Sequence, residues 1–446
     1  MSSTPAASNR ALDAAVREVE AAFVAANPKS HATWQQALKA MPGGNTRTVL
    51  HYDPFPATIV KGVGAYLHDL DGHRYVDFLG EYSAGLYGHS QQHIVDAVKT
   101  ALDDGIVLGG PNKYEVKLAE LIKERFPSVE QLRFCNSGTE ANIMNLSLAR
   151  LHTKRDAILV FDAGYHGGVL TFAYGGSPLN LPFPYVIAPY NDLAATTALI
   201  EQNKDRLAAV VVEPMMGGGG CIPATREFLA GLRAAADKHG IVLVCDEVMT
   251  SRLSYGGLQG KLGVRPDLTS FGKYIGGGLT FGAFGGRAEI LAPLDPRNPG
   301  ALSHSGTYNN NVLTMAAGYA GLSKVLTREA VERLNSNGEA LQVRLREVAA
   351  KVGVPLQVTG VGSLFCLHLQ SQPIRTPDDA HSDPQARKLL HLGLIQRGVY
   401  LARRGYVAMS LEIGEAEMTS FVDAIEDLLS EHRGALIEAD QKAAAE

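Results

Sequence analysis

The segment Ile241-Val242-Leu243-Val244-Cys245-Asp246-Glu247-Val248-Met249-Thr250 decides the fold of this 446-residue chain. Five apolar residues, a length typical of one strand, end directly in two carboxylates. Similar apolar runs recur at 132–134, 157–161, 208–212 and 268–271, separated by stretches of helical periodicity. Because the runs at 157–161, 208–212 and 241–245 are continuously apolar, their strands are expected to be covered on both faces. The pattern predicts an α/β fold with a central, mostly parallel sheet between helices.

The segments before and after these apolar runs have a different sequence pattern. Residues 1–74 contain an amphipathic helix and then short strands with Gly- and Pro-rich turns, whereas residues 325–446 mix long helices with strands. We therefore expect a large domain over residues 75–324. Residues 1–74 form an N-terminal segment, and residues 325–446 form a smaller α+β domain.

Composition narrows the possible partners. The chain has 41 Lys and Arg against 46 Asp and Glu, a net charge of −5, which argues against nucleic acid or an anionic membrane as partner. Its four cysteines stand singly, which is typical of reduced cytosolic thiols. The first 26 residues lack the apolar core of a signal peptide, and no apolar run approaches the ~20 residues of a membrane span. His89 and His93 lack the glutamate of a zinc-protease motif. We expect a cytoplasmic protein with no metal and no membrane partner.

Polar residues follow each apolar run, where an open parallel sheet binds its ligands. Ser137-Gly138-Thr139 stands between a strand and a helix. A helix that begins with free N–H groups beside a glycine is an anion site, although the same residues also suit a plain helix cap. The segment is neither a P-loop nor a dinucleotide fingerprint, because the required lysine and glycine spacing are missing.

Asp246 and Lys273 each end a buried strand. A partly desolvated carboxylate needs a cationic or donor partner, and a protonated pyridine nitrogen would serve, although for Asp246 taken alone a helix cap is the favoured interpretation. Lys273 precedes Gly276-Gly277-Gly278, and a desolvated lysine of lowered pKa is the kind that forms Schiff bases. An ordinary lysine on a surface turn is the alternative.

Taken together, the motifs resemble those of class III aminotransferases, which are fold-type I enzymes that use pyridoxal 5′-phosphate (PLP). The resemblance covers nearly the whole chain in the right order. It rests on the following motifs: Asn136-Ser137-Gly138-Thr139-Glu140-Ala141, Gly164-Tyr165-His166-Gly167, Glu213-Pro214, 246–250 and 272–278. It implies a large domain with a mostly parallel sheet and a small α+β domain built from both chain ends.

The resemblance also implies a role for each motif. Lys273 would hold the cofactor as a Schiff base and move the substrate proton, and Asp246 would pair with the pyridine nitrogen. Ser137, Gly138 and Thr139 would hold the phosphate. The remaining cofactor contacts would be Tyr165 and Val248 on the two ring faces, Glu213 on the substrate side, and Thr307 from a second subunit. The last contact implies a homodimer with shared active sites.

Two subgroups of the family fit the rest of the sequence. Residues 41–44 and 281–287 are similar to glutamate-1-semialdehyde 2,1-aminomutase, which moves an amino group within one molecule. Arg403 and Arg404, with Glu81-Tyr82 and residues 303–307, are instead similar to β-phenylalanine aminotransferase, and the early loop that contains Arg47 departs from the aminomutase pattern.

We expect the second activity: transfer of an amino group from an aromatic β-amino acid to a keto acid such as 2-oxoglutarate or pyruvate. Two arginines on different loops could bind carboxylates at two distances from the reacting amine. Arg403 is expected to be a solvated loop charge. The aminomutase, a PLP racemase and a binding protein without catalysis are the alternatives, and the presence of both Lys273 and Asp246 argues against the last.

Overall fold

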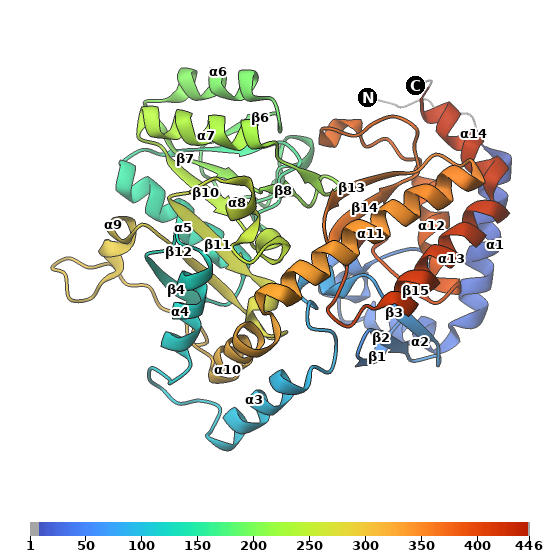
Figure 1. Ribbon diagram of the computed structural model, residues 1–446, viewed down its shortest axis with the longest axis horizontal. Coiled ribbons are helices and arrows are strands. Elements are labelled where there is room, and N and C mark those ends of the chain that lie inside the picture. The colour runs from blue at the N-terminus through green and yellow to red at the C-terminus, as the bar shows by residue number, and fades with distance from the viewer. Residues whose placement is uncertain (1–8, 445–446) are drawn as a thin grey trace.

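The computed structural model describes residues 9–444, so the first eight residues of the predicted N-terminal segment lie outside it. Its central element is a seven-stranded sheet in the order β4-β12-β11-β10-β7-β5-β6 (Figure 1). The strands of this sheet are β4 (Gln131–Cys135), β5 (Ala157–Phe161), β6 (Tyr185–Ala188), β7 (Leu207–Val212), β10 (Val242–Asp246), β11 (Leu268–Gly272) and β12 (Gly282–Gly286). Strands β11, β10, β7, β5 and β6 pair in parallel, and β12 runs antiparallel between β11 and β4. The expected α/β fold with a mostly parallel sheet is confirmed.

Strand β12 was not expected, because its residues 282–286 are mainly glycine. The structure explains this composition by close backbone contact. A Cβ atom on Gly282 would lie 2.3 Å from the carbonyl oxygen of Ser137, and one on Gly286 would lie 2.0 Å from that of Asp267. Glycine therefore lets β12 fit between its two neighbours.

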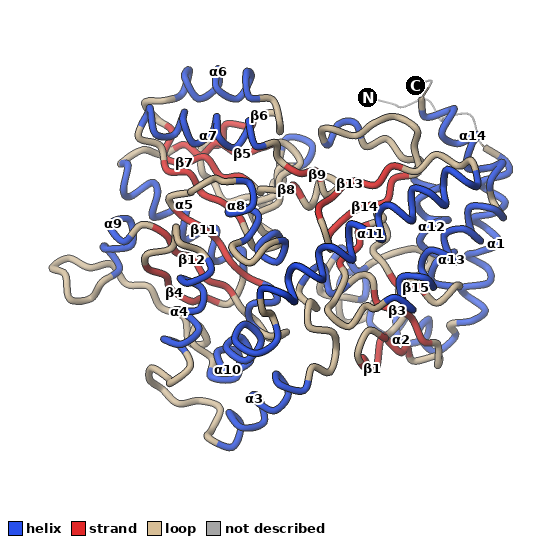
Figure 2. Tube along the Cα trace, in the orientation of Figure 1, coloured by secondary structure: helices blue, strands red, loops and turns tan. Residues whose placement is uncertain are grey.

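Helices cover both faces of the sheet (Figure 2). The helices in this part of the chain are α3 (Gln92–Asp103), α4 (Glu115–Arg125), α5 (Gly138–Thr153), α6 (Leu193–Asn203), α7 (Arg226–His239), α8 (Gly257–Leu262), α9 (Ala288–Leu291) and α10 (Val312–Ala320). All residues of β5 and β7 are buried, as continuous apolarity predicts. The carboxyl ends of β10 and β11 carry Asp246 and Lys273 to one edge.

Three smaller sheets accompany the large one. One has the order β1-β2-β3-β15, with β1 (Ile59–Val63), β2 (Tyr66–Asp69), β3 (Arg74–Asp77) and β15 (Val399–Tyr400). The others join β13 (Gln357–Val361), β14 (Leu364–His368) and β16 (Tyr406–Ala408), and β8 (Met215–Met216) with β9 (Ile222–Pro223). Because β15 pairs with β3, segments from the two halves of the chain share a sheet.

The remaining helices gather beside these small sheets, and the first described helix lies next to the last ones (Figure 1). They are α1 (Arg10–Ala26), α2 (Pro28–Ala37), α11 (Arg328–Val352), α12 (Pro384–Gln396), α13 (Glu415–Glu431) and α14 (Arg433–Ala443). The domain boundaries at residues 74 and 324 stay a prediction. Within residues 9–444, no helix combines the length and the apolarity that a bilayer crossing requires.

Candidate active site

The start of helix α5 forms one end of the site. Ser137 caps the helix, because its Oγ accepts a hydrogen bond from the backbone N–H of Glu140 at 3.1 Å. The N–H groups of Gly138 and Thr139 in the first turn have no partner within the helix. Together with the helix dipole, they favour an anionic group such as a phosphate at this position. Ser137 is thus a helix cap and part of an anion site at once.

Val248 closes the space between this helix start and Lys273. Its Cγ2 would lie 2.7 Å from a Cβ on Gly138, and its Cγ1 would lie 3.1 Å from a Cβ on Gly272. Only glycine at position 138 therefore leaves room for the valine side chain. The result is a narrow apolar wall beside the anion site.

Asp246 lies at the end of β10 with 5% of its surface exposed. Its Oδ2 accepts hydrogen bonds from His166 Nδ1 and Asn142 Nδ2, both at 2.8 Å, and its Oδ1 accepts one from the N–H of Val248 at 3.0 Å. Three donors therefore fix the orientation of this buried carboxylate, which suits it to face a cationic ring nitrogen.

His166 and Asn142 are site residues that the sequence reasoning missed. Burial alone would lower the pKa of His166, but the hydrogen bond to Asp246 and the charges of Asp246 and Glu213 outweigh it, so the pKa is raised. Asn142 also donates to the carbonyl oxygen of His166 at 3.0 Å. The polar Gly164–Gly167 motif was the signal for His166, whereas Asn142 sits within an ordinary helix and gave none.

Lys273 follows β11 directly and has a left-handed backbone, with φ of 55°. Its Nζ donates a hydrogen bond to the carbonyl oxygen of Tyr82 at 2.6 Å. Burial is the main cause that lowers the pKa of Lys273 to about 8; the charges of Arg404 and Arg47 act in the same direction, and those of Asp246 and Glu213 oppose it. At neutral pH, a far larger fraction of Lys273 is therefore in the neutral, nucleophilic form than of a solvated lysine.

Tyr165 and Glu213 form another part of the site and are joined by a hydrogen bond. Glu213 accepts hydrogen bonds from the N–H groups of Tyr165 and Gly217, both at 3.0 Å. Burial raises the pKa of Glu213. Tyr165 remains 52% exposed, so its ring is free to be covered by a flat group.

Arg47, Tyr82 and Arg404 form a third part of the site. The ring of Tyr82 has the guanidinium of Arg47 5.6 Å from its centroid and that of Arg404 5.9 Å from it. Arg47 also forms an ion pair with Glu81, while the Nε of Arg404 is buried without a partner in the described part of the chain. Arg403 is exposed. The structure thus brings both predicted arginines to one aromatic ring.

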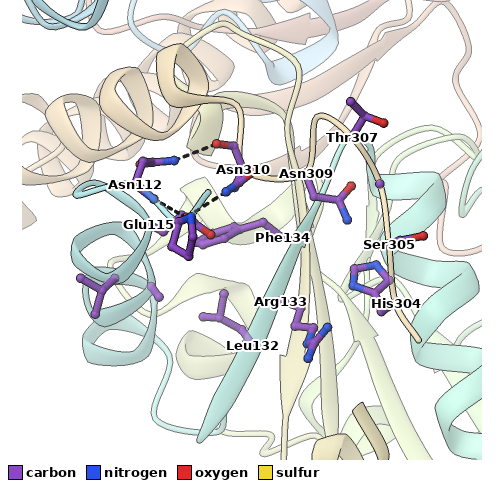
Figure 3. Close-up of a pocket in the computed structure, with 14 residues that line it drawn as sticks. Asn112, Glu115, Leu132, Arg133, Phe134, His304, Ser305, Thr307, Asn309 and Asn310 are labelled. Carbon is purple, nitrogen blue, oxygen red and sulfur yellow. Dashed lines mark hydrogen bonds between the residues drawn. The ribbon is translucent and has the colours of Figure 1, made fainter. Parts of the chain in front are cut away.

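Thr307 lies apart from these groups in this single chain. It is exposed and lines a surface cavity of about 950 Å³, together with Arg133 and Phe134 of β4 (Figure 3). Glu115 accepts hydrogen bonds from Asn112 at 2.8 Å and from Asn310 at 3.0 Å on the opposite side of that cavity. Lys273, Asp246 and Glu213 are not among the lining residues.

The groups collected around Lys273 fit PLP. The free N–H groups of α5 suit its phosphate, the hydrogen-bonded Asp246 suits its protonated pyridine nitrogen, and the lysine of lowered pKa suits its aldehyde. Tyr165 and Val248 suit its two faces. A mostly parallel sheet with this set of groups defines a fold-type I PLP enzyme.

Comparison with known proteins identifies the family. Residues 49–429 match the model of the family "Aminotransferase class-III". The chain belongs to this family, whose members are PLP-dependent, and it is an aminotransferase.

Two curated relatives cover most of the chain. A beta-phenylalanine transaminase of Variovorax paradoxus is 50% identical over 428 residues, 96% of this chain and 98% of the relative. A glutamate-1-semialdehyde 2,1-aminomutase of Thermodesulfovibrio yellowstonii is 37% identical over 87% of this chain and 95% of the relative. The crystal structure of the beta-phenylalanine aminotransferase from Variovorax paradoxus superimposes with a TM-score of 0.93 at 50% identity, covering 95% of this chain and 98% of that one.

Proposed function

We propose that this aminotransferase takes the amino group of an aromatic β-amino acid, such as β-phenylalanine, and gives it to a keto acid such as 2-oxoglutarate or pyruvate. The observation that carries this proposal is the pair of guanidiniums, Arg47 and Arg404, that both lie within 6 Å of the ring centroid of Tyr82, at 5.6 and 5.9 Å. A β-amino acid holds its carboxylate one carbon farther from the reacting amine than an α-amino acid does. Two arginines on separate loops supply two carboxylate positions for the two half-reactions.

The site residues then divide the work. When bound, PLP supplies an electron sink for the substrate carbon that loses a proton. The Nζ of Lys273 holds the cofactor and moves that proton, for which its lowered pKa suits it. Asp246 would pair with the ring nitrogen, while Ser137, Gly138 and Thr139 would hold the phosphate. Tyr165, Val248 and Glu213 orient the ring.

We also propose a homodimer in which Thr307 reaches the phosphate of the partner subunit's cofactor. Thr307 is exposed in the single chain, as a residue that serves a second site would be. Exposed apolar side chains of the loop between α3 and α4, including Val107 with 81% of its surface exposed, offer apolar area for such an interface. A cytoplasmic location is part of the proposal and agrees with the four free, buried cysteines.

A substrate comparison tests the proposal. The purified enzyme is given β-phenylalanine with 2-oxoglutarate or pyruvate, β-phenylalanine alone, and glutamate semialdehyde alone. We expect turnover of β-phenylalanine only with a keto acid. Conversion of glutamate semialdehyde without an acceptor would support the aminomutase instead, and loss of optical activity from β-phenylalanine alone would indicate a racemase.

A further inference from the structure

Arg252 is a buried cation that is not among the residues proposed to bind PLP or substrate. None of its surface is exposed, and no carboxylate forms an ion pair with it within residues 9–444. The side chains that act on its charge are those of Tyr406, Tyr274 and Tyr87, and burial lowers the pKa of Arg252 to about 10. Placing a guanidinium in such surroundings is costly, so the contacts it makes require an explanation.

Those contacts connect three separate sheets. Arg252 lies in a short helical turn (Thr250–Leu253) that follows β10, shortly after Asp246 at the end of that strand and Val248 in the loop. Its Nη1 donates to the carbonyl oxygen of Ser83 at 3.3 Å, in the turn after β3, and its Nη2 donates to the carbonyl oxygen of Met409, just after β16. One side chain thus links the large sheet to a turn beside the substrate arginines.

The turn that Arg252 binds has an unfavourable backbone. Residues 80–83 all have positive φ, with values of 51°, 47°, 52° and 77°, and three of them are not glycine. Each such residue carries a conformational cost that the surrounding structure must offset. Gly80 is also pressed against β16, since a Cβ there would lie 2.5 Å from the carbonyl oxygen of Ala408.

The same turn contacts both proposed carboxylate-binding arginines and Lys273. Glu81 forms the ion pair with Arg47, and the ring of Tyr82 lies beside the guanidiniums of Arg47 and Arg404. The carbonyl oxygen of Tyr82 accepts the hydrogen bond from Lys273. A shift of the turn would therefore displace the two arginines relative to the reacting amine.

We propose that Arg252 is a positioning residue: by binding the carbonyl oxygens of Ser83 and Met409 it holds the strained turn 80–83, and so sets the spacing of Arg47 and Arg404 around Tyr82. This inference rests on the proposed function, because it takes those arginines as the carboxylate sites. It assigns no contact between Arg252 and substrate or cofactor. The consequence is a specific loss of carboxylate binding when Arg252 is replaced.

The test compares Arg252→Met with a matched control, Arg125→Met. Arg125 is also buried and also donates to two carbonyl oxygens, those of Leu322 and Leu326 at 2.6 and 2.5 Å, but neither hydrogen bond reaches the turn 80–83, Arg47 or Arg404. The probe is 3-phenylpropanoate, which has the carboxylate and ring of β-phenylalanine without the amine and therefore does not react. Its dissociation constant from the holoenzyme is measured by calorimetry, together with the melting temperature and the PLP content.

We expect both variants to melt at lower temperature and to retain PLP. Arg252→Met alone should bind 3-phenylpropanoate on the order of ten- to a hundredfold more weakly and raise KM for β-phenylalanine more than it lowers kcat, since small displacements of positioning groups have effects of this size. Equal affinities in the two variants would overturn the proposal. Wild-type enzyme that holds PLP but does not bind 3-phenylpropanoate would instead refute the proposed substrate.

Arg252→Lys keeps the test decisive if Arg252→Met does not fold. Lysine retains the charge but has a single ammonium in place of the planar fork, so it cannot span both carbonyl oxygens in the same way. We expect a smaller loss of 3-phenylpropanoate affinity in the same direction. Wild-type affinity in a folded Arg252→Lys variant would contradict the proposal.

Discussion

Replacing Arg404 by alanine tests the proposed binding of the substrate carboxylate. Arg404 is half-buried, its guanidinium lies 5.9 Å from the ring centroid of Tyr82 and 5.3 Å from that of Tyr406, and its Nε has no partner among the described residues. A cation that lies beside two rings and keeps a free donor is prepared for a carboxylate. The substitution should therefore weaken acidic substrates and leave PLP in place.

The expected size follows from the burial of Arg404. Truncating one partner of a fully buried charge pair costs about 2–5 kcal/mol, and because Arg404 keeps some solvent contact we take the lower part, about 2–3 kcal/mol. At about 1.4 kcal/mol per factor of ten, this corresponds to a roughly 30- to 150-fold rise in KM. Because the charge of Arg404 also lowers the pKa of Lys273, its removal should raise that pKa above the value of about 8.

Steady-state kinetics with β-phenylalanine and 2-oxoglutarate measure both KM values, and the visible absorbance of bound PLP reports cofactor retention. Arg403→Ala is the matched control, since Arg403 is the exposed neighbour on the same loop. We expect it to behave as wild type. Equal KM values in the Arg404 and Arg403 variants would refute the assignment of Arg404 to a substrate carboxylate.

Three further perturbations follow from the contacts of single residues. Asp246→Asn removes the charge that three donors hold in place, so kcat should fall about a hundredfold or more, as for other preorganised electrostatic partners, and near-normal turnover would contradict its role. Gly138→Ala places a Cβ 2.7 Å from Val248, so the dissociation constant of PLP, measured by fluorescence, should rise; unchanged affinity would mean that the helix start does not hold the phosphate. His391 is buried, and mainly for that reason its pKa is lowered to about 3. As the pH falls below about 6.5, His391 is protonated in the unfolded chain but not in the folded one, so the fall in pH favours unfolding. Stability is then fully present above pH ~6.5 and should be about 2 kcal/mol lower at pH 5, and a His391→Leu variant that shows the same loss in urea titrations would rule out this cause.

The sequence predicts those parts of the site that stand at strand ends. Lys273 and Asp246 follow apolar runs, and Ser137 follows one before a helix, so their placement at one edge of the sheet can be inferred from the pattern alone. Strand β12 could not be, because glycines carry no hydrophobic pattern. Its presence is fixed by neighbouring backbones, as the contact of Gly282 with Ser137 illustrates.

Residues that act through tertiary contacts were out of reach of the same reasoning. Asn142 lies in the middle of a helix and His166 in a loop, and only the folded chain brings both to one oxygen of Asp246. Tyr82 and Arg252 are still harder to predict from the sequence, because their contacts join segments more than 150 residues apart. The periodicity of a local sequence segment does not indicate such long-range contacts.

The central claim is that Lys273 is the lysine that holds PLP and carries the reaction. Reduction of the holoenzyme with borohydride followed by peptide mapping tests it directly, because the reduced link is permanent. The account predicts a PLP label on Lys273, lost in Lys273→Ala while the variant stays folded. A label on any other lysine, or an unchanged label in Lys273→Ala, would contradict it.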